Sequence, residues 1–442
     1  MSPAVEDPTP VYDVVGVGFG PSNLALAIAL AEYEEQRGPG DPVVTARFLE
    51  RQESFAWHSG MLIDDATMQV SFLKDLVTLR NPASRFSFLS YLHARDRLVD
   101  FINHKTLFPL RAEFDDYFRW CAEAFRDQVS YGCEVTGVRP VEHDGEVVSL
   151  DVITSAGEVY RARNLVLATG LIPSMPPGVP EAERIWHSSS LLHRIDAVDP
   201  AGAKRFVVVG AGQSAAEVVA FLHDKFPGAE VCAVFSRFGL SPADDSPLAN
   251  RIFDPATVDE FYHAPEPMKR KLMDYHANTN YSVVDLDLIE ELYRRTYREK
   301  VLGTQRLRWF NVSRTVDVVD TGRGALVTVE SMTTGERTVL DADAAVFATG
   351  YRCDDSLPLL GELARCCHRD DCGRLRVTRD YRVVTDDRVR PAVYLQGGST
   401  EHTHGITSSL LSNCAVRAGE IVESLVRRVA SRPGELSVAG VR

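Results

Sequence analysis

Two glycine-rich turns, about 190 residues apart, constrain the fold of this chain more than any other feature. The first turn, Gly16-Val17-Gly18-Phe19-Gly20, lies between an apolar, β-branched stretch at residues 11–17 and a predicted helix at residues 24–31. Such a turn binds phosphate in a Rossmann unit, because glycines let the backbone approach a pyrophosphate at the positively polarised helix N-terminus. Pro21 replaces the usual third glycine, and proline is tolerated in the first turn of a helix.

The strands that follow the two glycine turns end in side chains of opposite charge. The strand predicted at residues 43–50 ends in Glu50, and a carboxylate there accepts hydrogen bonds from a ribose 2′-hydroxyl but repels a 2′-phosphate. The first unit is therefore predicted to bind FAD or NAD. The second turn is Gly210-Ala211-Gly212-Gln213-Ser214, and the strand predicted at residues 230–235 is followed by Arg237. Arginine forms paired hydrogen bonds with phosphate, so the second unit is predicted to bind NADPH.

Two further segments are near-repeats of each other. Residues 164–170 and 344–351 are each an apolar stretch that runs into Ala-Thr-Gly. A glycine at the end of a strand permits close approach of backbone to a nucleotide. We therefore expect each segment to close one of the two nucleotide-binding units.

Composition restricts the partners and the compartment. The chain has 442 residues and a net charge of −14, which is room for two or three domains and argues against nucleic acid or an anionic membrane as a partner. No apolar run reaches the roughly 18–20 residues of a membrane span. The acidic, proline-rich first ten residues lack the features of a signal peptide. We therefore expect a cytoplasmic protein.

The eight cysteines are scattered along the chain and do not suggest a disulfide framework. Three of them lie in the polar segment at residues 366–372, which is predicted to be a surface loop with reduced thiols. A zinc site there would need a second pair of ligands, which the sequence does not offer. No metal is expected.

Several motifs together resemble the microbial N-hydroxylating flavin monooxygenases, the L-ornithine and L-lysine hydroxylases of siderophore biosynthesis. The resemblance extends from about Tyr12 to about Glu423 and is closer to the ornithine branch at residues 278–285. The segment that contains Lys74 is its most specific mark. The motifs are Gly16-Val17-Gly18-Phe19-Gly20-Pro21-Ser22-Asn23, Met68-Gln69-Val70-Ser71-Phe72-Leu73-Lys74-Asp75-Leu76-Val77, Gly212-Gln213-Ser214-Ala215-Ala216-Glu217, Asp244-Asp245-Ser246-Pro247, Asn278-Thr279-Asn280-Tyr281, Phe347-Ala348-Thr349-Gly350-Tyr351 and Thr403-His404-Gly405-Ile406 with Leu410-Leu411-Ser412.

The resemblance implies roles for individual side chains. Lys74 would bind the α-carboxylate of the substrate, Asn280 and Asn311 would be its amide partners, and Ser409 would lie near the reacting amine. Around FAD we expect Gly16, Gly18, Gly20, Pro21, Ser22, Glu50, Met68, Gln69 and Ile406. Around NADPH we expect Arg111, Gly210, Gly212, Gln213, Ser214, Arg237 and Asp245. No side chain stands out as a catalytic general base.

The predicted fold is α/β, with two Rossmann-like dinucleotide-binding domains and a small, mostly helical substrate-binding region. The FAD-binding domain is expected at residues 9–203 with 352–430, the NADPH-binding domain at 204–246 with 315–351, and the helical region at 247–314. The resemblance implies a homotetramer.

The reaction that the resemblance implies uses NADPH and O2. A C4a-hydroperoxyflavin would hydroxylate the side-chain amine of L-ornithine to N5-hydroxy-L-ornithine. Hydroxylation of L-lysine or of a diamine, or another flavin-dependent oxygenation, remains open. A pyridine-nucleotide disulfide reductase would need a redox-active cysteine pair beside the flavin, and none lies near Gly16 or Ala168 in the sequence.

Overall fold

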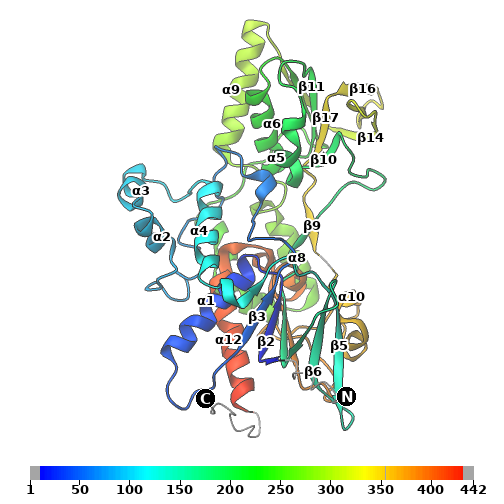
Figure 1. Cartoon of the computed structure of the whole chain (residues 1–442). Helices are drawn as coiled ribbons and strands as arrows, with labels where there is room; N and C mark the ends of the chain where they lie inside the picture. Colours follow the sequence, from blue (N-terminus) through cyan, green and yellow to red (C-terminus); the bar gives the residue numbers. More distant parts are fainter. Residues whose placement is uncertain (1–9, 354, 432–442) are drawn as a thin grey trace, which may run out of the picture.

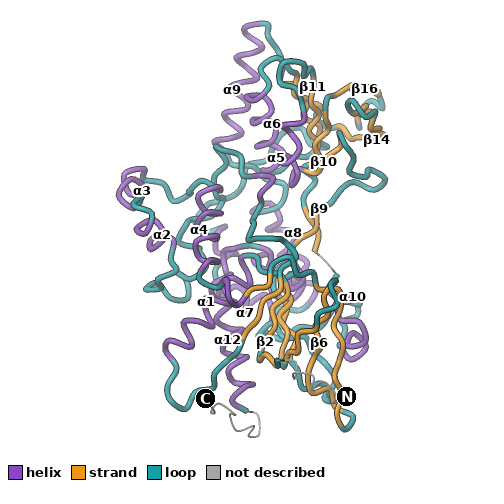
Figure 2. The backbone as a smooth tube through the Cα atoms, in the orientation of Figure 1, coloured by secondary structure: helices purple, strands orange, loops and turns teal. Residues whose placement is uncertain are grey.

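The protein has two lobes, each built around a parallel sheet. The computed structural model describes residues 10–353 and 355–431. Figure 1 shows one lobe around β2, β3, α1 and α12 and the other around β11, β17, α6 and α9. The strands of the two lobes form separate groups in Figure 2, with coil and helices between them. The chain passes from the first lobe to the second and then returns.

The first lobe contains a five-stranded parallel sheet in the order β19-β8-β2-β3-β4. Its first glycine turn joins β2 to α1, and α1 packs against α12 from the far end of the chain. A four-stranded sheet in the order β1-β7-β6-β5 completes the lobe. The bounds are β1 Val11–Tyr12, β2 Val14–Val17, α1 Pro21–Gln36, β3 Ala46–Leu49, α2 Phe88–Ala94, α3 Leu98–His104, α4 Arg111–Glu123, β4 Val129–Ser130, β5 Val135–His143, β6 Glu146–Thr154, β7 Val159–Ala162, β8 Asn164–Leu167, β19 Ala392–Leu395 and α12 Cys414–Ala430.

The second lobe contains a five-stranded parallel sheet in the order β10-β17-β11-β12-β13. Its glycine turn joins β11 to α6, and α9 packs against both α6 and β13. An antiparallel sheet, β14-β15-β16, lies beside it. The bounds are β10 Ile185–His187, α5 Leu191–Arg194, β11 Arg205–Val209, α6 Gln213–Lys225, β12 Glu230–Val234, α9 Leu286–Leu302, β13 Leu307–Phe310, β14 Ser313–Asp320, β15 Ala325–Ser331, β16 Arg337–Ala342 and β17 Ala344–Phe347.

Two strands and a group of short helices connect the lobes. β9 and β18 pair antiparallel where the chain leaves and re-enters the first lobe, and Figure 1 shows β9 between the two lobes. Helix α7 contacts α11 of the first lobe. The bounds are β9 Leu171–Pro173, η5 Ala249–Phe253, α7 Pro255–His263, α8 Glu266–His276, η6 Ala277–Thr279, β18 Tyr351–Cys353, α10 Leu357–Leu360, α11 Glu401–His404 and η9 Ile406–Ser409.

The α/β class with two Rossmann-like units is confirmed, but the domain limits predicted at residues 204 and 314 differ from the sheets. β10 lies before residue 204 yet pairs with β17 in the second sheet. β13 lies within the expected helical region, at residues 247–314, yet extends the same sheet, and α9 packs on it. A three-residue or four-residue strand takes its sheet from its pairing partner, which the sequence does not specify.

The expected surface loop of thiols is also partly wrong. Cys366 and Cys367 are buried and belong to the apolar core of the first lobe, and only Cys372 of this segment is exposed. Burial raises the pKa of the Cys367 thiol to about 11. These two thiols are therefore core side chains.

The two glycine turns share one local geometry. Gly18 has φ of +81° and Gly210 has φ of +144°, values that L side chains rarely adopt. A Cβ on Gly18 would lie 2.4 Å from the carbonyl oxygen of Ala168, and a Cβ on Gly210 would lie 2.4 Å from that of Ala348. Both alanines begin the Ala-Thr-Gly segments. Each segment thus packs directly against the glycine turn of its own unit, as a closing element should.

Trp186 of β10 belongs to the apolar core of the second lobe. Its side chain is fully buried, and its indole N–H donates to the carbonyl of Glu183 over 2.7 Å. We predict that Trp186→Ala lowers the free energy of unfolding by about 3–5 kcal/mol, because it leaves a large cavity in the core. Urea unfolding measures this, with Phe238→Ala as control because that ring is 84% exposed. Equal stability of the two variants would show that β10 is not part of the core.

Candidate active site

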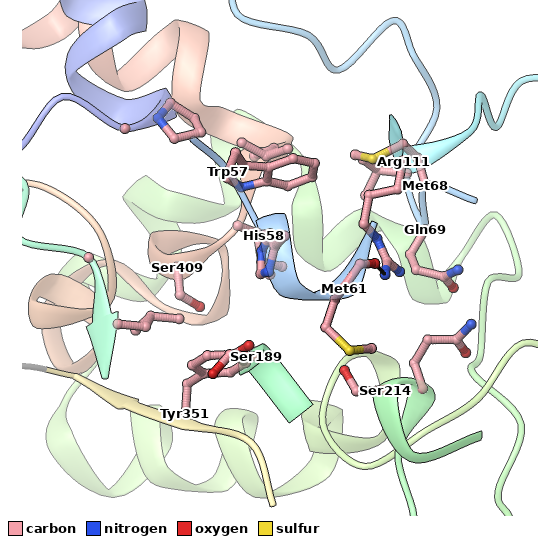
Figure 3. Close-up of a pocket in the computed structure, with 18 of the residues that line it drawn as sticks. Trp57, His58, Met61, Met68, Gln69, Arg111, Ser189, Ser214, Tyr351 and Ser409 are labelled. Carbon is pink, nitrogen blue, oxygen red and sulfur yellow. Dashed lines mark hydrogen bonds between the residues drawn. The ribbon is translucent and has the colours of Figure 1, made fainter. Parts of the chain in front are cut away.

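A cavity of about 2400 Å³ lies between the lobes, at the carboxyl ends of both parallel sheets. It is lined by Gly18 and Ala168 beyond strands of the first sheet and by Gln213 and Ser214 at the start of α6. Ligands of open α/β sheets bind at this edge. Figure 3 shows Ser409 on one side of the cavity and Met68, Gln69 and Arg111 on the opposite side, with His58 between them.

The first glycine turn offers an open cradle for a pyrophosphate. Gly20 is the N-cap of α1, and a Cβ built on it would meet nothing within 4 Å. Gly20, Pro21 and Ser22 all line the cavity, so the free end of the α1 dipole faces it. Gly16 does not line the cavity; a Cβ there would lie 2.4 Å from the ring of Phe48. Its role is packing of β2 against β3.

Glu50 lies where the sequence analysis places the ribose. The side chain is buried and lines the cavity. Its carboxylate accepts the N–H of Phe19 over 2.6 Å and the N–H of Gln52 over 2.9 Å. These bonds fix the carboxylate beside the glycine turn, and each oxygen retains a lone pair for a ribose hydroxyl. The residues of the first unit therefore fit FAD.

Arg417 of α12 fixes the wall of the cavity that carries Ser409. Its buried guanidinium donates to the carbonyl of Ser408 over 2.8 Å and to the hydroxyl of Ser22 over 3.2 Å. It also approaches the amide oxygen of Gln396 at 3.4 Å. Ile406 is buried in the same short helix, η9, and does not line the cavity. One side chain thus joins α12, η9 and the start of α1.

The second glycine turn has the same form. Gly212 is the N-cap of α6, and Gln213, Ser214 and Asp245 line the cavity. Arg237 lies beyond the end of β12, where its exposed guanidinium donates to the carbonyl of Ser282 over 2.9 Å. Gly210, Gly212 and Arg237 lie outside the cavity wall itself. An arginine at this strand end fits the 2′-phosphate of NADPH.

Lys74 lies in the cavity beside the short helix η5. Its ammonium is 5.5 Å from the ring centroid of Phe253, the last residue of η5. Burial lowers the pKa of Lys74, and the nearby carboxylate of Asp254 acts in the opposite direction. A partly desolvated ammonium gains more from an anionic partner than an exposed one does. Lys74, Asn280 and Ser409 all line the cavity, so the structure brings three of the four predicted substrate residues together.

Asn311 does not join them. It follows β13 in the second lobe, where its exposed amide donates to the carbonyl of Phe238 over 3.4 Å, and it does not line the cavity. The assignment of Asn311 to the substrate site is therefore not supported by its position. Pairing of β13 with β12 carries this residue to the neighbourhood of Arg237.

Asn250 is the amide that the sequence analysis missed. It lies in η5 with Phe253 and lines the cavity. Its side chain donates to the carbonyl of Asp245 over 2.6 Å. The signal was available, because Asn250 follows closely after the motif Asp244-Asp245-Ser246-Pro247.

An aromatic wall was also missed. Trp57, His58 and Tyr351 line the cavity, with ring centroids of His58 and Tyr351 6.3 Å apart. Burial, together with the Arg111 guanidinium, lowers the pKa of His58 to about 4. The sequence carries no periodic pattern in this loop from which the position of His58 could be predicted.

Within residues 10–353 and 355–431, no group of three or more His, Cys, Asp and Glu side chains could hold a metal ion. No helix in the same residues is long and apolar enough to cross a membrane.

The fold and the cavity together define a class: two facing dinucleotide-binding units, the first suited to FAD and the second to NADPH. Comparisons with known proteins specify it further. The family model described as L-lysine 6-monooxygenase/L-ornithine 5-monooxygenase matches residues 10–353. The chain belongs to this family.

Several relatives resemble the chain along nearly its whole length. An L-ornithine N(5)-monooxygenase of Pseudomonas aeruginosa is 39% identical, covering 96% of this chain and 95% of its own. An ornithine N-hydroxylase of Kutzneria sp. 744, solved with reduced FAD, NADP+ and L-ornithine, is 50% identical with a TM-score of 0.89, covering 95% of this chain and 100% of its own. An L-lysine 6-monooxygenase of Pseudomonas syringae is 32% identical with a TM-score of 0.83 and the same coverage.

The loop that carries Lys74 is held by Asp75. The buried carboxylate accepts the backbone N–H groups of Val77, Thr78 and Phe88 over 3.0, 2.6 and 2.8 Å. The hydroxyl of Thr78 donates to it as well. Four donors on one carboxylate fix the backbone next to Lys74.

We predict that Asp75→Asn lowers the free energy of unfolding by about 1–3 kcal/mol, because the new amide nitrogen faces donors and leaves them unpaired. Chemical denaturation measures the change. Asp100→Asn, at an exposed position on α3, is the matched control and should unfold like the wild type. An Asp75→Asn protein as stable as this control would contradict the role given to Asp75.

Proposed function

We propose that this protein hydroxylates the side-chain amine of L-ornithine to N5-hydroxy-L-ornithine, with FAD, NADPH and O2, for hydroxamate siderophore or related natural-product biosynthesis. The observation that carries the proposal is the position of Lys74, a partly desolvated ammonium in the cavity between the FAD and NADPH units. Relatives named for ornithine hydroxylation, 39–50% identical over most of the chain, support the same substrate.

Lys74 binds the α-carboxylate of the amino acid in this proposal. Asn280 and Asn250 lie in the same cavity and can hydrogen-bond the α-amino and α-carboxylate groups. Asn250 takes the place that the sequence analysis gave to Asn311. A diamine has no carboxylate and would leave the Lys74 ammonium without a partner, at a desolvation cost. The presence of Lys74 therefore favours an amino acid over putrescine or cadaverine.

Ser409 lines the same cavity, and its hydroxyl can accept from the side-chain amine. That nitrogen must be uncharged to form a bond to oxygen, and deprotonating an alkylammonium with a pKa of about 10.4 at pH ~8 costs about 3 kcal/mol. A hydroxyl orients a neutral amine without stabilising the ammonium, whereas a carboxylate would hold the proton on nitrogen. FAD held by Gly18, Gly20 and Glu50 would supply the redox chemistry, taking a hydride from NADPH and activating O2 for transfer of one oxygen atom.

The alternatives find less support in the structure. A disulfide reductase requires a cysteine pair beside the flavin, but the eight described cysteines are all free, and only Cys133 among them lines the cavity. L-lysine hydroxylation would use the same site with one more methylene. We choose ornithine because the relatives of 39% identity and above carry that name.

We further propose that the enzyme acts in the cytoplasm as a homotetramer. Exposed apolar side chains on α9, Tyr293 and Val301, and on α3, Val99 and Ile102, support self-association, since they are 62–72% exposed in the single chain. Light scattering of the purified protein tests the tetramer, and a monomer at micromolar concentration would contradict it.

The substrate experiment measures NADPH oxidation and hydroxylamine product with L-ornithine, L-lysine, putrescine and cadaverine. Lysine should bind nearly as well as ornithine, because one buried methylene is worth only about 0.8 kcal/mol. Its amine is displaced along the cavity, and a shift of about 1 Å can cost on the order of a hundredfold in rate. We predict that ornithine yields hydroxylamine and that lysine yields mainly H2O2. Equal or greater product from lysine would refute the ornithine assignment and leave the reaction class intact.

Lys74→Ala should lose ornithine-dependent hydroxylation while NADPH still reduces the flavin. A lost charge-assisted hydrogen bond of about 1.5–3 kcal/mol raises the ornithine KM roughly 10- to 100-fold. Lys74→Arg should retain part of the affinity, and Lys300→Ala, at an exposed position on α9, should match the wild type. Loss of FAD from Lys74→Ala would mean that the side chain serves the fold instead.

Arg237→Ala should discriminate between the two pyridine nucleotides. Loss of its phosphate contacts weakens the binding free energy of NADPH by about 1.5–3 kcal/mol. The binding free energy of NADH should stay nearly unchanged, because NADH has no 2′-phosphate. Stopped-flow reduction of the flavin by each nucleotide measures this, with the exposed Arg323→Ala as control. Equal losses for both nucleotides would exclude a 2′-phosphate contact.

A further inference from the structure

A ring of five polar side chains crosses the boundary between the lobes at the edge of the cavity. Two of them, Gln69 and Arg111, belong to the first lobe; the other three, Gln213, Glu217 and Asp285, belong to the second. Neither Glu217 nor Asp285 was assigned a role by the sequence analysis. Figure 3 shows Gln69 and Arg111 on the same side of the cavity, with Ser214 of α6 below them.

In the first lobe, Gln69 and Arg111 lie on two neighbouring backbone segments that are hydrogen-bonded to each other. Thr67 and Leu110 form an antiparallel bridge, the N–H of Arg111 donates to the carbonyl of Ala66 over 2.7 Å, and the N–H of Met68 donates to that of Pro109 over 2.8 Å. These backbone contacts join the segment that carries Gln69 to the segment that carries Arg111.

Arg111 makes the first contact between the lobes. Its guanidinium binds Glu217 of α6 through two bonds of 2.9 and 2.7 Å and also donates to the carbonyl of Met61. The two side chains are 12% and 5% exposed. A paired, nearly buried arginine and carboxylate fixes an orientation as well as a distance. Removal of one partner leaves the other charge buried and uncompensated.

Asp285, the N-cap of α9, makes the second contact. Its carboxylate accepts the amide N–H of Gln69 over 2.6 Å, and its own backbone N–H donates to the amide oxygen of Gln213 over 2.9 Å. Gln213 in turn donates to Glu217 over 3.1 Å. The ring is thereby closed from one lobe to the other and back.

We propose that Glu217 and Asp285 are positioning residues for hydride transfer: through Arg111 and Gln69, they hold the NADPH-binding lobe at the distance and angle from the flavin that the transfer requires. The proposal rests on the proposed NADPH-dependent reduction of FAD. The ring is placed for this task, because Gln213 and Glu217 lie in the first turns of α6 and Met68 and Gln69 lie in the facing wall of the cavity. Hydride transfer is steep in distance, so a small shift of one lobe lowers its rate.

The negative charge of Glu217 also affects the site at which NADPH is expected. The carboxylate lies near the helix end at which anionic NADPH is expected, and Arg111 compensates it. Arg111→Ala alone therefore does more harm than the loss of a nucleotide contact, since it also leaves the Glu217 charge unpaired. Glu217→Ala combined with Arg111→Ala removes that charge and should recover part of the loss.

The test is anaerobic stopped-flow reduction of the FAD-loaded enzyme by NADPH without ornithine, which gives the limiting reduction rate and the NADPH Kd separately. We expect Glu217→Ala and Asp285→Ala to lower the limiting rate at least fivefold with FAD content unchanged. Asp285→Asn keeps an acceptor for Gln69 and should retain the wild-type rate. Arg111→Ala should be slower than the double variant Arg111→Ala/Glu217→Ala by at least threefold. The control is Glu290→Ala, at an exposed position on α9.

The outcomes separate the two proposals. A wild-type enzyme that NADPH does not reduce would contradict the proposed function itself. If the wild type is reduced and both Glu217→Ala and Asp285→Ala keep its limiting rate, the positioning role is overturned. A double variant no faster than Arg111→Ala would mean that Arg111 acts only by direct contact with the nucleotide. Should Glu217→Ala fail to fold, Glu217→Gln together with the Asp285 pair decides the question by the same rate.

Discussion

The structure depends on the close approach of two carbonyl groups to two glycines that lack side chains. Gly18 and Gly210 each lie so near the carbonyl of an alanine that no Cβ could be accommodated. This contact brings an Ala-Thr-Gly segment against each glycine turn and leaves the N-termini of α1 and α6 facing the cavity. Both predicted nucleotide-binding turns, and the spacing of the strand ends around them, require glycine at positions 18 and 210.

Two buried charges at the site, those of Asp75 and Arg417, are each matched by several hydrogen bonds. Asp75 accepts four donors, and Arg417 donates to three acceptors on different segments. Asp75 fixes the backbone next to Lys74, and Arg417 fixes the backbone next to Ser409. Burial lowers the pKa of Lys74, and the carboxylate of Asp254 only opposes that effect. A cation kept partly desolvated in a cavity is suited to an anionic ligand.

The boundary between the lobes combines apolar packing with polar contacts of defined geometry. Met61, Ile63 and Ala66 pack into the apolar core of the second lobe. Arg111 with Glu217 and Gln69 with Asp285 span it, and each pair is short and directional. Polar contacts of this kind specify one arrangement of two lobes, whereas an apolar contact would tolerate sliding. The polar pairs thus add a defined orientation to the apolar contact between the lobes.

The sequence by itself determined the two Rossmann-like units, the opposite charges of Glu50 and Arg237, and the motif that carries Lys74, because each is a local pattern along a strand, a turn and a helix start. Only the tertiary structure decided where β10 and β13 pair, which took Asn311 away from the cavity and left Asn250 in it. Only the tertiary structure also joined Arg111 to Glu217 and Gln69 to Asp285. Strand pairing and contacts between residues more than 100 positions apart arise from packing. They cannot be predicted from the local periodicity of the sequence.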